Sequence, residues 1–200
     1  MADEKRKELV LFAGPNGSGK STVINFLLEQ EAIPRYYICP DNNLDKRYAN
    51  DKNAYIKAME KAEEQRYEAV DLEKSFTFES VFSTREKLEF LQFAKSKGYF
   101  ISVFFFATKN PSINIKRVRY RVEHGGHGVP EDKIVSRYHR SMELMGSCFG
   151  VADAVFMIDA SEDKFVLLFA VIDGKLTLTA ERTETMWLGK YLPTHIIELL

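Results

Sequence analysis

The stretch LVLFAGPNGSGKST at residues 9–22 limits the folds open to this 200-residue chain more than any other part of it. An apolar run of strand-forming residues breaks into three glycines and then continues into the helical pattern VINFLLEQ. Glycines let successive backbone N–H groups turn toward one centre, and the start of a helix adds the positive end of its dipole. A strand, a glycine-rich turn and a helix in this order predict a cradle for a polyphosphate.

The glycine-rich turn matches G-x-x-x-x-G-K-[S/T], the phosphate-binding loop. Lys20 is expected to reach the β- and γ-phosphates of ATP, and the Ser21 hydroxyl to coordinate the Mg²⁺ that bridges them. A glycine turn without a ligand is the alternative, and the strand before it and the helix after it argue against that interpretation. The predicted nucleotide-binding residues are Gly14, Pro15, Asn16, Gly17, Ser18, Gly19, Lys20, Ser21 and Thr22.

Composition and charge exclude several classes of protein. A length of 200 residues with 45% hydrophobic content suits one compact domain, and a net charge of −1 provides no general attraction to nucleic acid or membrane. Cys39 and Cys148 are too few for a disulfide framework and are expected to be buried, reduced thiols. The N-terminus is polar and no apolar run reaches membrane-spanning length, so we expect a soluble, cytoplasmic protein.

Strand and helix patterns alternate along the chain, which predicts an α/β fold with a mainly parallel central sheet. A β-hairpin around Asp173-Gly174 and a short helix after Pro193 follow the alternating part, so the C-terminal region of about 163–200 differs from the rest. Strands are expected at residues 8–13, 36–39, 76–82, 99–107, 154–159, 165–172 and 175–180, and helices at 20–31, 53–74, 84–98, 112–122 and 131–145.

Two acidic residues are expected at the ligand-binding edge of this sheet. Asp41 follows the second strand, and ligands in open α/β sheets bind at the carboxyl ends of strands. Asp41 could equally cap the turn or a following helix. Glu79 and Ser80 lie near the end of the apolar segment FTFESVF, where a carboxylate is costly to bury without a partner. We therefore expect Glu79 to meet a ligand or an arginine.

Basic residues concentrate in residues 116–140, with seven Lys or Arg against three Asp or Glu. Two basic helices joined by the glycine-rich residues 123–130 predict a lid over phosphates, at about 111–147, because arginine neutralises the charge of a transferring phosphoryl group. A solvated helical face and a nucleic-acid patch are the alternatives. His124-x-x-His127 has the spacing of a metal site without a further ligand cluster, so loop hydrogen bonding is the favoured interpretation.

The order of these features resembles the zeta-toxin-like P-loop kinases. The resemblance rests on GPNGSGKST, on Asp41, on FTFESVFS at residues 76–83, and on the pattern R-V-x-x-R-V-E-x-G-G-H-x-V-P-E at residues 117–131. It spans about residues 8–160, and the Gly-Gly-His lid is similar to that of the compact stand-alone branch. The resemblance implies the P-loop kinase fold, a three-layer α/β/α arrangement with strand order 2-3-1-4-5.

The resemblance also implies an activity and a set of roles. The family transfers the γ-phosphate of ATP, with Mg²⁺, to a small molecule, and in its toxin members to the sugar hydroxyl of UDP-N-acetylglucosamine. Toxin members pair with an antitoxin that covers the nucleotide site. Carried over by position, Lys20 and Ser21 hold ATP and Mg²⁺, Asp41 is the base, and Glu79, with Ser80 beside it, holds the substrate. Arg121 and Arg137 match the lid arginines, with Arg117 and Arg140 as alternates.

Two other functions are compatible with the sequence. An ATP-hydrolysing switch would place a magnesium-binding aspartate after an apolar strand, and Asp159 ends such a strand late in the chain. A nucleic-acid or nucleoside kinase would use the basic residues 116–140, although the chain lacks a positive net charge.

Overall fold

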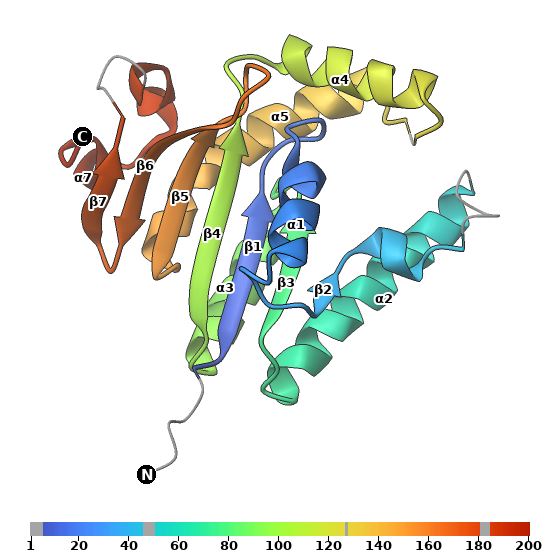
Figure 1. Cartoon of the computed structure of the whole chain (residues 1–200), viewed down its shortest axis with the longest axis horizontal. Coiled ribbons are helices and arrows are strands. Elements are labelled where there is room, and N and C mark those ends of the chain that lie inside the picture. Colours follow the sequence, from blue (N-terminus) through green and yellow to red (C-terminus); the bar gives the residue numbers. More distant parts are fainter. Residues whose placement is uncertain (1–5, 46–50, 127, 181–184) are drawn as a thin grey trace.

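The computed structural model describes residues 6–45, 51–126, 128–180 and 185–200, and its centre is a twisted, mainly parallel sheet (Figure 1). The described strands form one seven-stranded sheet in the order β2-β3-β1-β4-β5-β6-β7, with β1 to β5 parallel and the last two antiparallel. The predicted order 2-3-1-4-5 and the C-terminal hairpin are confirmed. The strands are β1 (Glu8–Ala13), β2 (Tyr37–Ile38), β3 (Phe76–Ser80), β4 (Phe100–Ala107), β5 (Ala154–Asp159), β6 (Val166–Ile172) and β7 (Lys175–Thr179).

The helices lie close to their predicted positions. The strand expected to reach residue 82 ends earlier, because the Ser80 hydroxyl accepts the backbone N–H of Phe82, whose φ of 54° cannot continue a strand. Three short 3₁₀ turns were not predicted. The described helices are α1 (Lys20–Glu29), α2 (Lys52–Asp71), α3 (Arg85–Ser96), α4 (Pro111–Glu123), α5 (Glu131–Met145) and α7 (Thr194–Ile197), with 3₁₀ turns η1 (Pro40–Asn43), η3 (Gly146–Gly150) and η4 (Met186–Tyr191).

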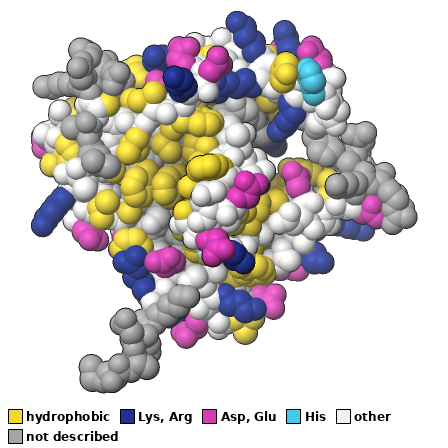
Figure 2. Space-filling view, in the orientation of Figure 1, with side chains coloured by type: hydrophobic (Ala, Val, Ile, Leu, Met, Phe, Trp, Pro, Cys, Tyr) yellow, Lys and Arg dark blue, Asp and Glu magenta, His cyan; other side chains and the backbone are white. Residues whose placement is uncertain are grey.

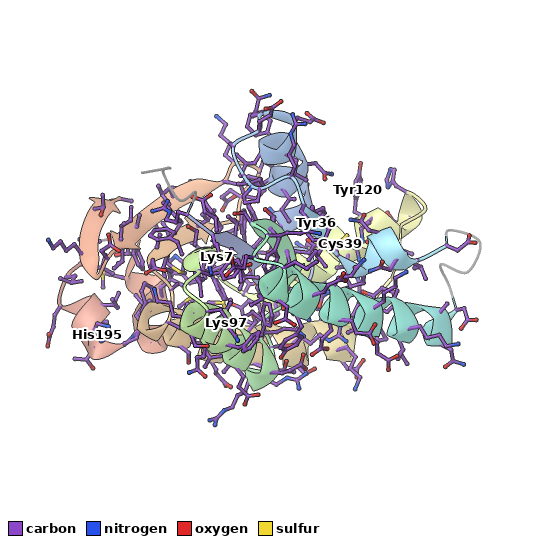
Figure 3. The ribbon with its side chains drawn as sticks, turned by 90° about the horizontal axis from the view of Figure 1, so that it is seen from below. Lys7, Tyr36, Cys39, Lys97, Tyr120 and His195 are labelled. Atoms are coloured by element: carbon purple, nitrogen blue, oxygen red, sulfur yellow. The ribbon has the colours of Figure 1, made fainter. Side chains whose placement is uncertain are left out.

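Helices cover both faces of the sheet, as the view along the strands shows (Figure 3). Leu9 and Leu11 of β1 face a core cluster shared with α2, α3 and α5, whereas Val10 and Phe12 face a smaller cluster shared with α1. Successive side chains of a strand point to opposite faces of the sheet. Because helices cover both faces here, both sets of side chains in β1 are apolar, which explains its continuous apolar sequence. The fold is therefore the expected three-layer α/β/α arrangement.

The carboxyl ends of β1 to β4 meet at one edge of the sheet, because these strands run parallel. The glycine-rich loop follows β1, η1 follows β2, and Ser80 ends β3. The chain leaving β4 enters α4, which lies above this edge, and α5 then runs back along one face of the sheet (Figure 1). Three candidates that are far apart in the sequence, Lys20, Asp41 and Glu79, are thereby brought to one edge of the sheet.

Several minor expectations can also be compared with the structure. Cys39 and Cys148 are free and buried, as predicted, and burial raises the pKa of the Cys148 thiol to about 12. Trp187 and Tyr191 pack against the core. Among the helices that the structure describes, none combines the length and apolar character that crossing a bilayer requires.

Candidate active site

The loop between β1 and α1 has the backbone that a phosphate cradle requires. Gly14, Gly17 and Gly19 have φ values of 137°, 74° and 87°, in the region that residues with a Cβ rarely adopt. A Cβ on Gly14 would overlap the carbonyl oxygen of Phe106, and one on Gly19 would lie 2.7 Å from the ring of Phe165. Glycine is therefore required at these positions both by conformation and by close packing.

Lys20 begins α1 and turns back over the loop. Its Nζ donates to the carbonyl oxygens of Gly14 at 2.8 Å and Pro15 at 3.0 Å. An ammonium has three donor hydrogens, so one remains for a phosphate oxygen. Burial lowers the pKa of Lys20 to about 8, with the Glu79 carboxylate opposing this shift and the Arg121 guanidinium adding to it. Lys20 is thus held by the loop and lies within electrostatic reach of both side chains.

The loop also contains polar atoms that the protein does not satisfy. Asn16 Oδ1 and Ser18 Oγ are buried, and neither has a hydrogen-bond partner in the part of the chain that the structure describes. Such atoms are costly unless a ligand or water pairs with them. The first turn of α1 carries no acidic residue, which leaves its N-terminal N–H groups available to an anion. These features fit the phosphates of ATP.

Ser21 and Glu79 form a hydrogen-bonded pair beside the loop. Ser21 Oγ donates to Glu79 Oε2 at 2.9 Å, and β1 and β3 are paired so that Phe12 lies opposite Glu79. Burial raises the pKa of the Tyr37 hydroxyl, and the Glu79 charge adds to this rise. Glu79 therefore contacts Ser21 beside the loop. A serine hydroxyl and a carboxylate are suitable ligands for Mg²⁺, whose charge would neutralise the phosphates.

The alternative magnesium ligand, Asp159, is placed differently. Its strand β5 is separated from β1 by β4, and its Oδ1 accepts the backbone N–H of Ser161 at 2.8 Å. Its Oδ2 lies 3.7 Å from Lys109 Nζ. Asp159 is thus engaged in local structure, away from Ser21. Within the described ranges no three His, Cys, Asp or Glu side chains gather as a metal-binding group, and His127 lies outside them.

Asp41 lies in the first turn of η1 at the carboxyl end of β2, and it is exposed. The proposed capping role for a following helix is wrong, because Asp51 caps α2 by accepting the N–H of Asn53 at 2.8 Å. No side chain caps η1. Ser80, by contrast, uses its hydroxyl to accept the Phe82 N–H at 2.9 Å, so it supports the strand end locally.

Tyr55 of α2 lies among the charged candidates, and sequence reasoning missed it. Burial raises the pKa of its hydroxyl, and the Asp41 charge adds to this rise while Arg137 and Arg121 oppose it. The Glu79 charge also raises the pKa of this hydroxyl. Tyr55, which is 39% exposed, thus lies within electrostatic reach of all four predicted charged residues.

The arginines of α4 and α5, the predicted lid helices, differ in what surrounds them. Arg121 and Arg137 act electrostatically on Tyr55, and Arg121 also acts on Lys20. Arg117, one of the alternates, instead donates to the carbonyl oxygens of Ala160 at 2.5 Å and Glu162 at 2.7 Å. Two further arginines make local contacts: Arg119 pairs with Glu131 at 2.6 Å, and Arg140 donates to the Ser136 carbonyl oxygen at 3.3 Å.

His124 hydrogen-bonds locally, as predicted. Its Nδ1 lies 2.8 Å from the carbonyl oxygen of Tyr120, one turn earlier, and its ring lies against the ring of Tyr120 with centroids 4.1 Å apart.

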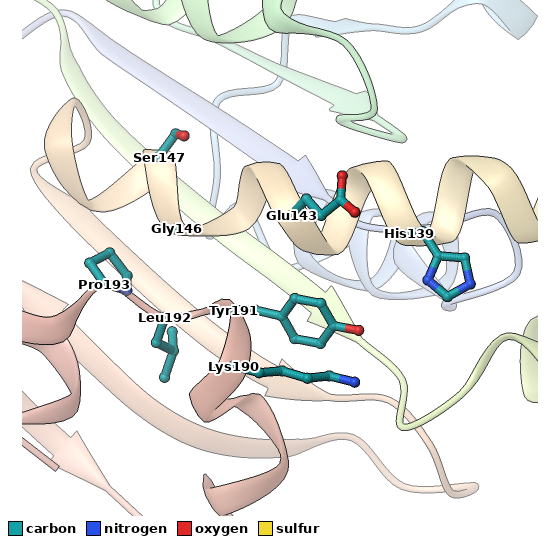
Figure 4. Close-up of a pocket in the computed structure, with 8 residues that line it drawn as sticks. All are labelled: His139, Glu143, Gly146, Ser147, Lys190, Tyr191, Leu192 and Pro193. Atoms are coloured by element: carbon teal, nitrogen blue, oxygen red, sulfur yellow. The ribbon is translucent and has the colours of Figure 1, made fainter.

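The space-filling view shows the molecule hollowed between the lid and the arm formed by η1 and α2 (Figure 2). A separate cavity of about 570 Å³ lies between the C-terminal part of α5 and η4, lined by His139, Glu143, Tyr191 and neighbouring residues (Figure 4). None of the predicted site residues lines that cavity. The hollow beside the phosphate loop, and not this cavity, is therefore the candidate active site, because Lys20, Ser21 and Glu79 lie there.

Comparisons with known proteins agree on the fold. No family model matches the chain. An uncharacterized protein of Haemophilus influenzae is 28% identical over 133 residues, which are 66% of this chain and 94% of that protein. The solved AvrRxo1-ORF1:-ORF2 complex matches with a TM-score of 0.69 and 15% identity over 96% of this chain, and it has also been solved with ATP. This chain spans 66% of the matched AvrRxo1 chain, about two thirds of its length.

A structure of the PezAT toxin–antitoxin system of Streptococcus pneumoniae matches with a TM-score of 0.59 and 17% identity, over 98% of this chain and 88% of that one. At such low identities the similarity establishes the fold alone. The chain thus has the P-loop kinase fold expected from its sequence.

Proposed function

We propose that this chain is a single ATP-dependent kinase domain that transfers the γ-phosphate to a hydroxyl of a small molecule. The observation that carries the proposal is the phosphate loop, whose glycines and Lys20 have the required geometry and whose Ser21 is hydrogen-bonded to Glu79. The charges of Asp41, Glu79, Arg121 and Arg137 all influence Tyr55 nearby. Phosphoryl transfer needs in-line positioning, cations on the phosphates and a group that orients the nucleophile. The hollow beside the phosphate loop contains a candidate for each of these requirements.

The roles follow from position. Lys20 and the loop bind the phosphates, and Arg121 and Arg137 compensate the charge that spreads over the transferring group. Asp41, exposed at the end of β2, accepts the proton of the acceptor hydroxyl. Ser21 and Glu79 would hold Mg²⁺, whose charge would offset that of the phosphates, and Glu79 and Ser80 border the acceptor. The ATP-bound AvrRxo1 structure, which has the same fold, supports the nucleotide part of this assignment.

We infer that the acceptor is a nucleotide sugar such as UDP-N-acetylglucosamine, or a related metabolite. The support is the resemblance in the phosphate loop, Asp41, the third strand and the Gly-Gly-His lid, together with the fold shared with PezAT. A nucleic-acid acceptor is less well supported, because Arg117 and Arg119 of the basic segment are engaged within the protein. A partner protein that covers the nucleotide site is a further part of this proposal, since PezAT is a toxin–antitoxin system and AvrRxo1-ORF1 was solved as a complex with AvrRxo1-ORF2.

One experiment separates these functions. The protein is incubated with γ-labelled ATP and Mg²⁺ together with nucleotide sugars, nucleosides or short oligonucleotides, and mass spectrometry identifies the molecule that gains phosphate. Phosphate on the sugar of a nucleotide sugar supports the proposal. Release of inorganic phosphate at an equal rate with every acceptor indicates an ATPase, and transfer to an oligonucleotide indicates a nucleic-acid kinase.

A further inference from the structure

A buried amide connects the phosphate loop to the lid. Asn114 of α4 is fully buried, and its Nδ2 donates to the carbonyl oxygen of Asn16 in the loop at 2.7 Å. Its Oδ1 accepts from the Thr108 hydroxyl at 2.6 Å. The carbonyl oxygen of Thr108 in turn accepts from the hydroxyl of Tyr138 in α5 at 2.6 Å. One chain of hydrogen bonds therefore links the loop, the end of β4 and both lid helices.

The direction of these hydrogen bonds is fixed by chemistry. The carbonyl oxygen of Asn16 can only accept, so the NH₂ group of Asn114 must face the loop. The amide oxygen of Asn114 can also only accept, so the Thr108 hydroxyl must donate to it. Because Thr108, Asn114 and Tyr138 are buried, breaking one of these bonds leaves a buried polar atom without its partner. Thr108 consequently holds Asn114 in the orientation that the loop requires.

The bond to Asn16 sets the orientation of one peptide plane. In a trans peptide the C=O and the following N–H point in opposite directions, and the described chain contains no cis peptide. When Asn114 holds the carbonyl of Asn16, the N–H of Gly17 points away from α4. A Cβ on Gly17 would lie 2.8 Å from the carbonyl oxygen of Asn114, so helix and loop are also in close contact here.

We propose that Asn114 is a positioning residue for nucleotide binding, which fixes the Asn16–Gly17 peptide plane and ties the phosphate loop to the helix that carries Arg121. Arg121 lies two helical turns beyond Asn114 on the same face of α4. A shift of the loop is therefore transmitted to this arginine through a rigid helix. The inference rests on the proposed function, since it assumes that the loop binds ATP.

The test is a double-mutant cycle in which calorimetry measures the affinity for ATP with Mg²⁺. Asn114→Ala removes the bond to Asn16 and is expected to weaken ATP binding by about 10-fold. Thr108→Val removes only the hydroxyl that orients Asn114 and is expected to weaken binding by about 3-fold. In the Asn114→Ala background Thr108→Val should have no further effect on affinity, because its influence passes through the amide.

The matched control is Thr77→Val. Thr77 is also fully buried, and its hydroxyl donates to the carbonyl oxygen of Pro34 at 2.9 Å, remote from the loop. This variant should lower the thermal unfolding midpoint as Thr108→Val does, yet bind ATP as the unmodified protein does. If Asn114→Ala fails to fold, the comparison of Thr108→Val with Thr77→Val carries the test.

The outcomes separate this inference from the proposed function. Additive effects of the two substitutions on affinity, or ATP binding by Asn114→Ala or Thr108→Val equal to that of the unmodified protein, would overturn the positioning role. If the unmodified protein itself does not bind ATP, the proposed function fails and the inference fails with it.

Discussion

The hydroxyl of Ser21, in the first turn of α1, and the carboxylate of Glu79, near the end of β3, are hydrogen-bonded at 2.9 Å. The sequence predicted Ser21 as a metal ligand and Glu79 as a substrate ligand. Their contact makes Glu79 a candidate for both tasks, because a carboxylate next to the serine hydroxyl can take part in holding Mg²⁺ while it faces the acceptor. A role in holding Mg²⁺ would appear in the Mg²⁺ dependence of ATP binding, and a role in holding the substrate would appear in the KM for the acceptor.

Glu79→Gln keeps the size and the hydrogen-bonding capacity of the side chain and removes its charge. We expect the Mg²⁺ concentration that gives half-maximal ATP binding to rise by about 10-fold, because a neutral amide is a weaker ligand for Mg²⁺. Calorimetric titration of ATP at several Mg²⁺ concentrations measures this. Without Mg²⁺ the variant should bind ATP at least as well as the unmodified protein, since a negative charge near the phosphates is gone. An unchanged Mg²⁺ response with a raised KM for the acceptor would assign Glu79 to the substrate alone.

Asp41→Asn should separate binding from chemistry. The variant is expected to bind ATP normally and to lower kcat by about 100-fold or more, because the amide cannot accept the proton of the acceptor hydroxyl. Initial rates of phosphate transfer together with ATP affinity measure the two effects. A normal kcat would remove Asp41 from the mechanism.

Local features of the site could be predicted from the sequence, and features that depend on tertiary packing could not. The phosphate loop imposes its requirements on consecutive residues, so Gly14, Gly19 and Lys20 were sufficient to identify it. The rule that ligands bind at the carboxyl ends of strands made Asp41 a candidate, and only the resemblance to the zeta-toxin-like kinases favoured it over a capping role. By contrast, Arg117 faces the carbonyls after β5, a contact that no pattern within α4 encodes.

Two residues of the site were missed for different reasons. Tyr55 sits near the start of α2, and the four charged residues that act on it come from four other elements, η1, β3, α4 and α5. Asn114 did leave a signal, because it precedes Val118 by one turn on the buried face of α4, where an apolar residue would be expected. A polar residue in such a position indicates a buried partner.

The affinity for ATP should depend on pH through Lys20. Its pKa of about 8 means that the ammonium loses its proton as the pH rises through this value. The phosphates bind the charged form better, so ATP binding raises the pKa and takes up a proton. Affinity should consequently be constant well below pH 8 and fall above it, by up to about 10-fold per pH unit until the pKa of the complex is reached.

Lys20→Arg is the matched control for this titration. Arginine stays charged throughout, so this variant should bind ATP more weakly and show no decline between pH 7.5 and about 9.5. Calorimetry at a fixed Mg²⁺ concentration, with circular dichroism confirming the fold at each pH, measures both proteins. Constant affinity of the unmodified protein across this range would contradict the role given to Lys20.

The two lid arginines should matter for catalysis and Arg119 should not. Arg121→Ala and Arg137→Ala are each expected to lower kcat by about 100-fold or more, because the developing charge on the phosphoryl group loses a cation. Arg119→Ala, two residues from Arg121, removes only an exposed pair with Glu131 and should leave kcat within about 2-fold. Equal losses in all three variants would indicate that general disruption of the lid, and not charge compensation, accounts for the effect.

Tyr55→Phe tests whether the tyrosine hydroxyl contributes to binding the acceptor. Burial and the Asp41 charge hold the pKa of Tyr55 above its ordinary value, so the hydroxyl remains protonated at neutral pH and can donate. Next to Asp41, it is placed to donate to an oxygen of the acceptor. Removing it should raise the KM for the acceptor by about 3- to 10-fold without changing ATP affinity. Steady-state kinetics with the acceptor varied at saturating ATP measure this.

The control for Tyr55→Phe lies on the same helix. Tyr67 has the same exposure of 39%, but its ring packs against Phe90, with centroids 5.1 Å apart, on the side of α2 that faces α3. Tyr67→Phe should therefore leave the KM for the acceptor unchanged. If both substitutions raise it equally, the effect comes from α2 as a whole. If neither does, the acceptor binds without the Tyr55 hydroxyl, and Asp41 alone orients it on this side of the hollow.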